Sequence, residues 1–343
     1  MARLVVVTQR VASGDPALGF FVSWLERLAT RFEMIDVITL AKGDSVGIGN
    51  VDIHVLPQNR LRRFFAYQMS LVRLLPGSSG LFAHMCPEYV VAGGWVARLM
   101  RKPVLLWYAH RSVTWRLRVA ALFANAIFTA SPEGCRLKSN KVEVVGHGID
   151  SDRFKPAAGV PVEEGSIVTV GRVSPIKRLE NLLQAMPAVI GLVPDAHLTI
   201  VGGAYLPADR EYERILKAMV RALGIDDRVR WRAPVDRSTM PDVYRKAALV
   251  VNLAPTGGLD KVVLEAMACA RPVAAANAGF WDMMAGDAAR GRVTDLSPQS
   301  LGTQIVSLLA DPYPAESLRL AVIERHSLDR LADRIFGFFR ARD

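Results

Sequence analysis

The feature that most constrains the fold is a regular alternation of short apolar runs with segments of helical periodicity. In the first half of the chain the apolar runs have strand length and are rich in β-branched residues. Short strands separated by helices are typical of a parallel sheet covered by helices on both faces. We therefore predict a doubly wound α/β unit. Its expected strands cover residues 3–9, 34–40, 51–56, 80–85, 103–109 and 126–130, and its first helix covers residues 20–32.

The same alternation begins again in the second half. Strands are expected over residues 166–172, 196–203, 228–233, 248–254 and 272–277, with helices over 179–191 and 210–224. The segment 146–165 is rich in glycine, proline and charge and has no periodicity, so we interpret it as a hinge or linker. The expected fold class is α/β. Two Rossmann-like domains, residues 1–145 and 166–325, would face each other across a cleft.

Size and cysteine content limit the class of protein. With 343 residues, 51% of them hydrophobic, the chain is large enough for two buried cores. Its three cysteines, Cys86, Cys135 and Cys269, are too few and too scattered for a disulfide framework or a zinc site. No apolar run reaches the ~18 residues of a membrane span, and the first apolar run is interpreted as a strand rather than a signal peptide. We expect a cytoplasmic protein that is at most peripheral to the inner face of the membrane.

Nearly all of the net charge of +10 lies in the first half. Residues 1–160 contain 20 Lys and Arg against 11 Asp and Glu, whereas residues 161–343 contain 23 against 22. Such asymmetry indicates an anionic partner. The segment from Asn59 to Leu75 has the pattern of a basic amphipathic helix, and the segment from Arg111 to Arg118 adds arginines, so an anionic membrane surface is the expected partner. Solvated surface helices are the alternative. Nucleic acid is not expected, because no binding motif accompanies the charge.

The stretch from Pro255 to Cys269 carries the first chemical signal. An apolar strand is followed by a glycine turn, which contains Gly257, Gly258 and Leu259, and then by a helix with one carboxylate, Glu265. The first N–H groups of a helix have no partner within the helix, so this arrangement can bind an anion. Asp260 would cap the helix and Lys261 would stand beside Glu265. A capped helix with a surface ion pair is the alternative interpretation of the same residues.

A second basic stretch follows the first strand of the second half. Gly171 begins the sequence GRVSPIK, in which Arg172 and Lys177 leave the same rim of the sheet as the glycine turn. An arginine fork and a lysine charge opposite a helix N-terminus suit a diphosphate, and Glu265 could accept hydrogen bonds from ribose hydroxyls. Neither GxxxxGK[ST] nor a GxGxxG after the first strand is present.

Two histidines follow strands of the first half. His110 comes directly after an expected strand and is as suited to catalysis as to packing, whereas His84 is expected to be a packed residue.

The second half resembles the GT-B glycosyltransferases, specifically the retaining family 4 type, or glycosyl transferases group 1. The resemblance is specific over residues 146–285 and weaker over 1–145, and HGIDSDRF looks like the hinge signature of the family. It is carried, in order, by GRVSPIK, LTIVGG, LGIDDRVRW, MPDVYRKAALVVNLA and LDKVVLEAMACARPV.

The resemblance implies a role for each matching segment. The second domain would hold a UDP- or GDP-sugar, with its diphosphate on Arg172 and Lys177, its ribose on Glu265 and its base near Val235. The first domain would bind a glycan or lipid-linked acceptor, with Gly14 and Asp15 near the diphosphate and His110 at the sugar. A C-terminal helix, residues 326–343, would cross back to the first domain.

One position departs from the family pattern. The first carboxylate of its Glu-x7-Glu motif, which usually contacts the donor sugar, is replaced by Gly257, and Asp260 or the amides of Gly258 and Leu259 would have to substitute. The absence of a DxD motif favours transfer without a metal or other cofactor. Two alternatives stay open: a catalytically degenerate binding or assembly subunit, and a nucleotide-sugar epimerase of the same fold.

Overall fold

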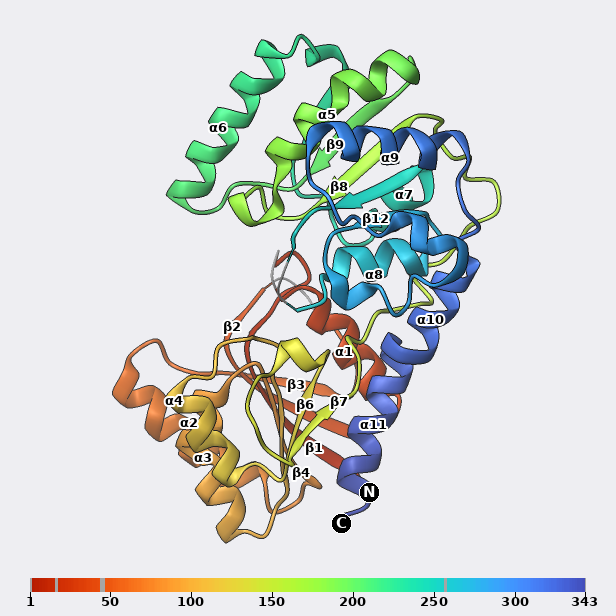
Figure 1. Cartoon of the computed structure of the whole chain (residues 1–343). Coiled ribbons are helices and arrows are strands. Elements are labelled where there is room, and N and C mark those ends of the chain that lie inside the picture. The colour runs from red at the N-terminus through yellow and green to blue at the C-terminus, as the bar shows by residue number, and fades with distance from the viewer. Residues whose placement is uncertain (1, 16–17, 44–46, 256–257, 343) are drawn as a thin grey trace. The chain divides into compact units, whose positions relative to one another are not determined.

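The computed structural model describes residues 2–15, 18–43, 47–255 and 258–342 (Figure 1). Contacts divide the chain into two compact units. Unit 1 comprises Met1–Asp150 and Arg325–Asp343, and unit 2 comprises Ser151–Glu324. Each unit is built around one parallel sheet.

The sheet of unit 1 has the strand order β3-β2-β1-β4-β5-β6-β7, and all its paired strands are parallel. The six strands expected from the sequence are confirmed, while the short edge strand β7 was not predicted. The strands are β1 (Arg3–Val11), β2 (Met34–Lys42), β3 (Val51–Val55), β4 (Gly80–His84), β5 (Val104–Trp107), β6 (Ala126–Thr129) and β7 (Val142–Val144).

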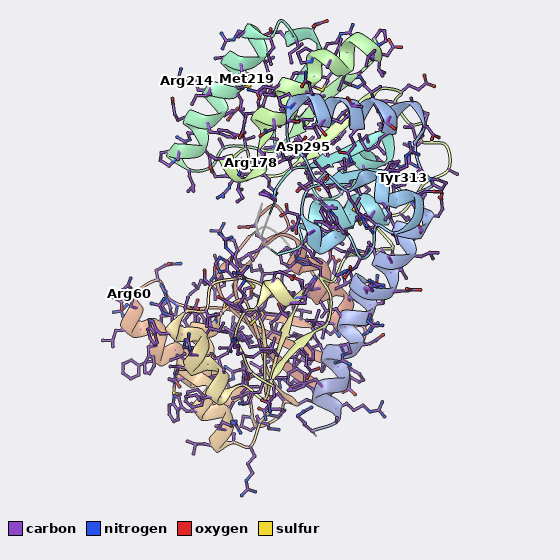
Figure 2. The ribbon with its side chains drawn as sticks, viewed as in Figure 1. Arg60, Arg178, Arg214, Met219, Asp295 and Tyr313 are labelled. Carbon is purple, nitrogen blue, oxygen red and sulfur yellow. The ribbon has the colours of Figure 1, made fainter. Side chains whose placement is uncertain are left out.

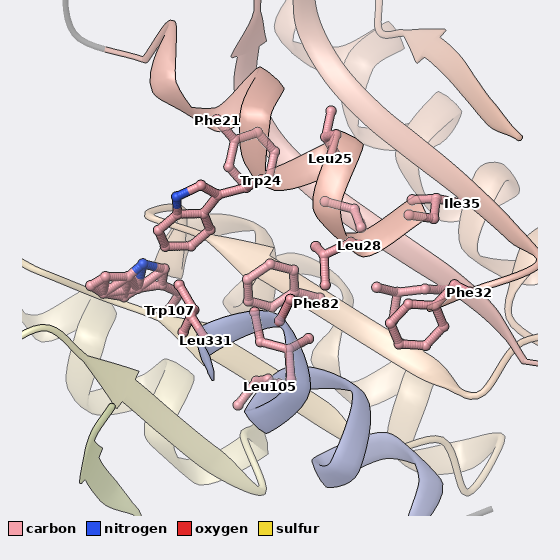
Figure 3. Close-up of a cluster of buried hydrophobic side chains, with 14 of the residues drawn as sticks. Phe21, Trp24, Leu25, Leu28, Phe32, Ile35, Phe82, Leu105, Trp107 and Leu331 are labelled. Carbon is pink, nitrogen blue, oxygen red and sulfur yellow. The ribbon is translucent and has the colours of Figure 1, made fainter. Parts of the chain in front are cut away.

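Helices cover both faces of this sheet. Alternate residues of β1 point to opposite faces, so that Leu4 and Val6 belong to one buried cluster while Val5 and Val7 belong to the other. The first cluster packs under α1 and α11 and contains Trp24, which stacks on Trp107 at a ring distance of 5.4 Å (Figure 3). The second packs under α2, α3 and α4. The helices are α1 (Phe20–Ala29), α2 (Arg60–Leu74), α3 (Pro87–Leu99), α4 (Trp115–Phe123) and α11 (Leu328–Arg340), with the 3₁₀ turn η1 (Pro132–Gly134).

The sheet of unit 2 has the order β10-β9-β8-β11-β12 and is also parallel. Its five strands were all expected. They are β8 (Ser166–Val170), β9 (His197–Val201), β10 (Val229–Arg232), β11 (Leu249–Asn252) and β12 (Val273–Ala275). The helices are α5 (Leu179–Leu192), α6 (Pro207–Ala222), α7 (Met240–Lys246), α8 (Lys261–Ala268), α9 (Pro298–Ala310) and α10 (Glu316–His326), with the 3₁₀ turns η2 (Pro175–Lys177), η3 (Asp226–Arg228), η4 (Ala278–Phe280) and η5 (Gly286–Gly291).

The strand order identifies where a ligand would bind in each unit. In unit 2 the chain runs outward from β8 to β10 and then returns to the other side of β8 with β11. In unit 1 the same reversal falls between β1 and β4. Ligands of such sheets bind outside the carboxyl ends of the strands at this point, because the loops of the two strands diverge there and leave a crevice.

Candidate functional site

The reversal in unit 2 lies between the two segments that the sequence singled out. Gly171 to Lys177 follow β8, and the segment after β11 leads into α8. Gly171 has φ +137°, and a Cβ there would lie 3.3 Å from Cε of Lys177, so glycine lets this side chain lie close to the end of β8. Gly202, at the end of β9, approaches Gly171 so closely that a Cβ would lie 1.8 Å from its carbonyl oxygen.

The two segments meet through a charged contact. Nζ of Lys177 donates to Oδ2 of Asp260 at 2.7 Å, and Nδ2 of Asn252 donates to the same oxygen at 3.1 Å. Asp260 occupies the N-cap position of α8, but its side chain accepts no hydrogen bond from the helix. The predicted capping role is therefore wrong, because Lys177 and Asn252 take the carboxylate instead.

Arg172 is the more exposed of the two predicted diphosphate-binding cations. Its side chain is 46% exposed, and its Nε lies 3.6 Å from Oδ2 of Asp209, beyond hydrogen-bond distance. Asp209 is buried, and it accepts a hydrogen bond from the N–H of Leu206 at 3.2 Å. The guanidinium of Arg172 thus retains donors that can bind an anion.

Glu265 is buried one turn into α8. Tyr244 donates to its Oε2 at 3.1 Å, and Nη1 of Arg237 lies 3.6 Å from its Oε1. Burial raises the pKa of the Glu265 carboxyl, while the charges of Arg237 and Lys261 and the Tyr244 hydrogen bond oppose that rise. The alternative interpretation, a surface ion pair between Lys261 and Glu265, is wrong because the ends of both side chains are buried.

Lys261 places an amino group near this buried carboxylate. Its Nζ is inaccessible to solvent, and burial together with the nearby charge of Arg237 holds its pKa well below the usual range. Arg237 lies with its Cζ 5.5 Å from the centre of the Phe154 ring, and its Nε makes no hydrogen bond with the described residues. Arg237 is therefore the cation that compensates the buried carboxylate of Glu265.

The remaining predicted residues of unit 2 lie around these groups. The carbonyl of Gly258 accepts from Nδ2 of Asn277 at 3.4 Å, and Leu259 is buried. Val235 is half-buried in the loop that follows β10 and leads to Arg237. Gly257 lies outside the described residues.

The predicted residues of unit 1 follow strands β1 and β5, which are separated in the sheet by β4 alone. A Cβ added to Gly14 would have no atom of the described residues within 4 Å, and Asp15 accepts from Nη1 of Arg10 at 3.0 Å. His110 is exposed, and its Nδ1 accepts from the N–H of Ser112 at 3.1 Å. His84 is buried at the end of β4 and stacks on Phe21 at a ring distance of 4.0 Å, which agrees with its prediction as a packed residue.

Sequence reasoning missed four partners of the predicted site residues. Asn252 stands at the end of a predicted strand, which is a position where a polar side chain could have drawn attention. The others lie on separate elements and become neighbours only through tertiary packing. They are Asp209, Arg237 and Tyr244.

Neither a cluster of metal ligands nor a membrane-spanning helix is present in the part of the chain that the structure describes. No group of three or more His, Cys, Asp or Glu side chains there is arranged to hold a metal ion. No helix in the described ranges has both the length and the apolar character required to cross a membrane.

Comparison with known proteins identifies the fold and the family of one segment. Residues 164–311, within unit 2, match the family described as Glycosyl transferases group 1. Alr3699/HepE of Anabaena in complex with UDP superposes with a TM-score of 0.78 at 18% identity, over 99% of this chain and 100% of that one. Sucrose-phosphate synthase of Thermosynechococcus elongatus gives 0.74 at 19%, over 99% of both. The chain has the GT-B fold, and the resemblance of its second half to glycosyl transferases group 1 is confirmed over residues 164–311.

Curated relatives cover a smaller part of the chain. D-inositol 3-phosphate glycosyltransferase 2 of Catenulispora acidiphila is 31% identical over 186 residues, which is 50% of this chain and 43% of the relative. D-inositol 3-phosphate glycosyltransferase of Mycolicibacterium smegmatis is 27% identical over 220 residues, 59% of this chain and 50% of the relative. The chain spans about half the length of the curated relatives it matches.

Proposed function

We propose that this chain, a GT-B protein with a group 1 glycosyltransferase segment, is a retaining hexosyltransferase of the family 4 type. It moves a sugar from a UDP- or GDP-sugar to a cell-surface glycan or lipid-linked acceptor. The observation that carries the proposal is the contact between Lys177 and Asp260 at 2.7 Å, which brings the basic segment after β8 to the N-terminus of α8. A cation, exposed arginine donors and a helix N-terminus at one rim suit a diphosphate.

In this proposal, different residues of unit 2 bind the diphosphate, the ribose and the base of the donor. Arg172 and Lys177 hold its diphosphate together with the amides near Gly171, Gly258 and Leu259. Glu265 accepts from the ribose, and the loop at Val235 holds the base. UDP and UDP-glucose are bound by the Anabaena neighbour, which makes a uridine donor the first to test here.

The chemistry requires stabilisation of a departing diphosphate. The bond between the anomeric carbon and the phosphate oxygen breaks, and a new bond to the acceptor oxygen forms on the same face of the sugar. The acceptor hydroxyl passes its proton to the departing phosphate. Arg172 and Lys177 neutralise the developing negative charge, and such preorganised donors can do this without a metal ion.

The acceptor binds to unit 1 in this proposal. Gly14 and Asp15 follow the carboxyl end of β1, and His110 follows that of β5, with β4 between the two strands. Ligands of such sheets bind at these strand ends. The relatives are named as D-inositol 3-phosphate glycosyltransferases, so a polyol carrying an anionic group is a sensible first acceptor to test.

An anionic membrane surface is the proposed partner of α2, α3 and α4. Arg60 projects from the start of α2 (Figure 2), and Arg62 and Arg73 are also exposed. Between them Phe65 is 60% and Met69 is 67% exposed. The large apolar side chains exposed on these three helices are Leu61, Phe64, Phe65, Met69, Val72, Trp95, Leu99, Trp115 and Leu122. Interleaved basic and apolar side chains are typical of helices that lie in the headgroup region of anionic lipids.

A panel of sugar nucleotides tests the proposed donor class. Thermal unfolding is measured with UDP-, GDP- and ADP-sugars in turn. A ligand present at 100 times its dissociation constant stabilises the folded state by about 2.7 kcal/mol, so one nucleotide class should raise the melting temperature and the others should not. A flat response to all three classes would contradict the proposal.

A binding or assembly subunit without turnover is the second candidate. It is favoured by the sequence, in which Gly257 replaces the first carboxylate of the Glu-x7-Glu motif. Incubation with the nucleotide sugar that stabilises the protein separates the two. Slow hydrolysis of the donor supports an enzyme, while tight binding with no release of the nucleoside diphosphate supports a binding subunit.

A further inference from the structure

We infer that Asp260 is the residue that recognises the donor sugar, with Lys177 bridging its carboxylate and the diphosphate. This inference rests on the proposed function. It assigns a specificity-determining role to one side chain of the site.

The first reason is the charge of the site. A carboxylate repels a diphosphate, yet Asp260 lies 2.7 Å from Nζ of Lys177 and at the N-terminus of α8. It does not cap the helix. A carboxylate in this place is explained if the ligand presents hydroxyl groups as well as phosphates, because ionised carboxylates are strong acceptors of hydrogen bonds from hydroxyls.

The second reason is that only one half of the carboxylate is used. Oδ2 accepts from both Lys177 and Asn252, which fixes the orientation of the group. Oδ1 accepts no hydrogen bond from the described residues, and the side chain is 33% exposed. Asp260 is therefore a preorganised acceptor on a partly exposed side chain, with one oxygen that accepts no hydrogen bond from the described residues.

The third reason is the reach of Lys177. An ammonium group has three protons, and one of them bonds to Asp260. The remaining two can bind a phosphate oxygen. The sugar of a nucleotide sugar is attached to the phosphate farther from the ribose. When Lys177 binds that phosphate, the carboxylate of Asp260 lies next to the sugar. Glu265 is buried deeper in α8 and has Tyr244 and Arg237 as partners, so it is the less accessible of the two carboxylates.

The experiment compares the affinity for the sugar nucleotide with that for the nucleoside diphosphate alone. Isothermal titration calorimetry is carried out with UDP, UDP-glucose, UDP-galactose, UDP-N-acetylglucosamine, GDP and GDP-mannose. The sugar nucleotide that binds best is then titrated into Asp260→Asn. A lost hydrogen bond to a charged group corresponds to about a tenfold to hundredfold loss of affinity. We expect this loss for the sugar nucleotide, while the nucleoside diphosphate binds as well as before or more tightly.

Two further variants keep the result interpretable. Asp260→Glu retains the charge but displaces it, and should give an intermediate loss for the sugar nucleotide. Asp311→Asn removes the same charge from an exposed pair with Arg290 on the same unit, and should change neither affinity.

Each other outcome overturns the inference. Equal weakening of both ligands would mean that Asp260 only positions Lys177. Equal strengthening of both would mean that Asp260 only competes with the phosphates. No change in either would remove it from the site. These results leave the proposed function intact, whereas a wild-type protein that binds none of the six nucleotides would contradict the proposed function and this inference with it.

Discussion

At the residue scale, the site is defined by how each charge is compensated. Lys177 and Asp260 neutralise each other at a partly exposed rim, whereas Glu265 is buried between Arg237, Lys261 and the Tyr244 hydroxyl. A buried carboxylate without such partners would be strongly destabilising. The two carboxylates therefore differ in access, because Asp260 is partly exposed and Glu265 is buried.

The backbone contact between Gly202 and Gly171 gives a first prediction. Replacing Gly202 by alanine would put a Cβ 1.8 Å from the Gly171 carbonyl, at a residue with φ +147°. We expect Gly202→Ala to lower the free energy of unfolding by about 2–4 kcal/mol. Gly203→Ala is the matched control, because its Cβ would be 3.6 Å from Pro234, and chemical denaturation measures both. Similar stabilities for the two variants would contradict this close approach of the Gly171 and Gly202 backbones.

His326 gives a prediction for pH dependence in unit 1. It is buried, and burial together with the charge of Arg325 lowers its pKa from 6.5 to about 4. The unfolded chain therefore binds a proton between these values when the folded one does not, so stability falls as the pH is lowered through this window. From pH 7 to pH 5 this histidine should remove about 2 kcal/mol from the free energy of unfolding.

The variant His326→Gln isolates that contribution. Urea unfolding at the two pH values should show a smaller loss for the variant than for the wild type, by the amount stated above. An identical loss in both proteins would mean that His326 takes up its proton as readily in the folded chain as in the unfolded one.

At the scale of elements, α2 illustrates how one helix serves the core and the surface. Tyr67, Leu71 and Leu74 are buried against the sheet, and Asn59 caps the helix by accepting from the N–H groups of Leu61 and Arg62. Its other face exposes large apolar and basic side chains. Burying that face among lipid headgroups would remove apolar surface from water while the arginines meet anionic lipid.

Vesicle co-sedimentation tests this face of α2. Vesicles of phosphatidylcholine with anionic phosphatidylglycerol are used at low salt. We expect the wild type to bind, and the double variant Phe64→Glu/Phe65→Glu to bind at least tenfold more weakly. Two apolar contacts are lost, and two negative charges are added that the anionic lipid repels. Leu192→Glu, at an exposed apolar position of unit 2, is the control and should bind as the wild type does. No binding of the wild type to these vesicles would contradict the proposed partner.

At the scale of the whole molecule, the chain repeats one architectural principle in two units. Each has a parallel sheet with one reversal of strand order, and most of the predicted site residues follow strands at or next to that reversal, while Val235 follows the edge strand β10. The excess of positive charge belongs almost entirely to residues 1–160. The nearly neutral half carries the predicted donor residues, and the basic half carries the exposed face of α2.

The fold was largely predictable because apolar strand-length runs report burial on both faces of a parallel sheet. Strand β7 escaped prediction because three residues at a sheet edge carry almost no pattern. Arg172, Lys177 and Glu265 were predicted as site residues from local spacing and from a family resemblance. The capping role given to Asp260 was wrong, since a local rule cannot anticipate that Lys177, 83 residues away, competes for its carboxylate. Asp209, Arg237 and Tyr244 depend on tertiary packing in the same way.

Hydrolysis of the donor tests the proposed diphosphate site, since it requires the diphosphate to be held and released but requires no knowledge of the acceptor. The rate of nucleoside diphosphate release is compared for the wild type, Arg172→Ala and Lys177→Ala, with melting temperatures as a check of folding. We expect the rate to fall by about 10²–10³ for each variant, because a preorganised donor to the leaving group is lost. Folded variants that turn over at the wild-type rate would show that Arg172 and Lys177 do not hold the leaving group.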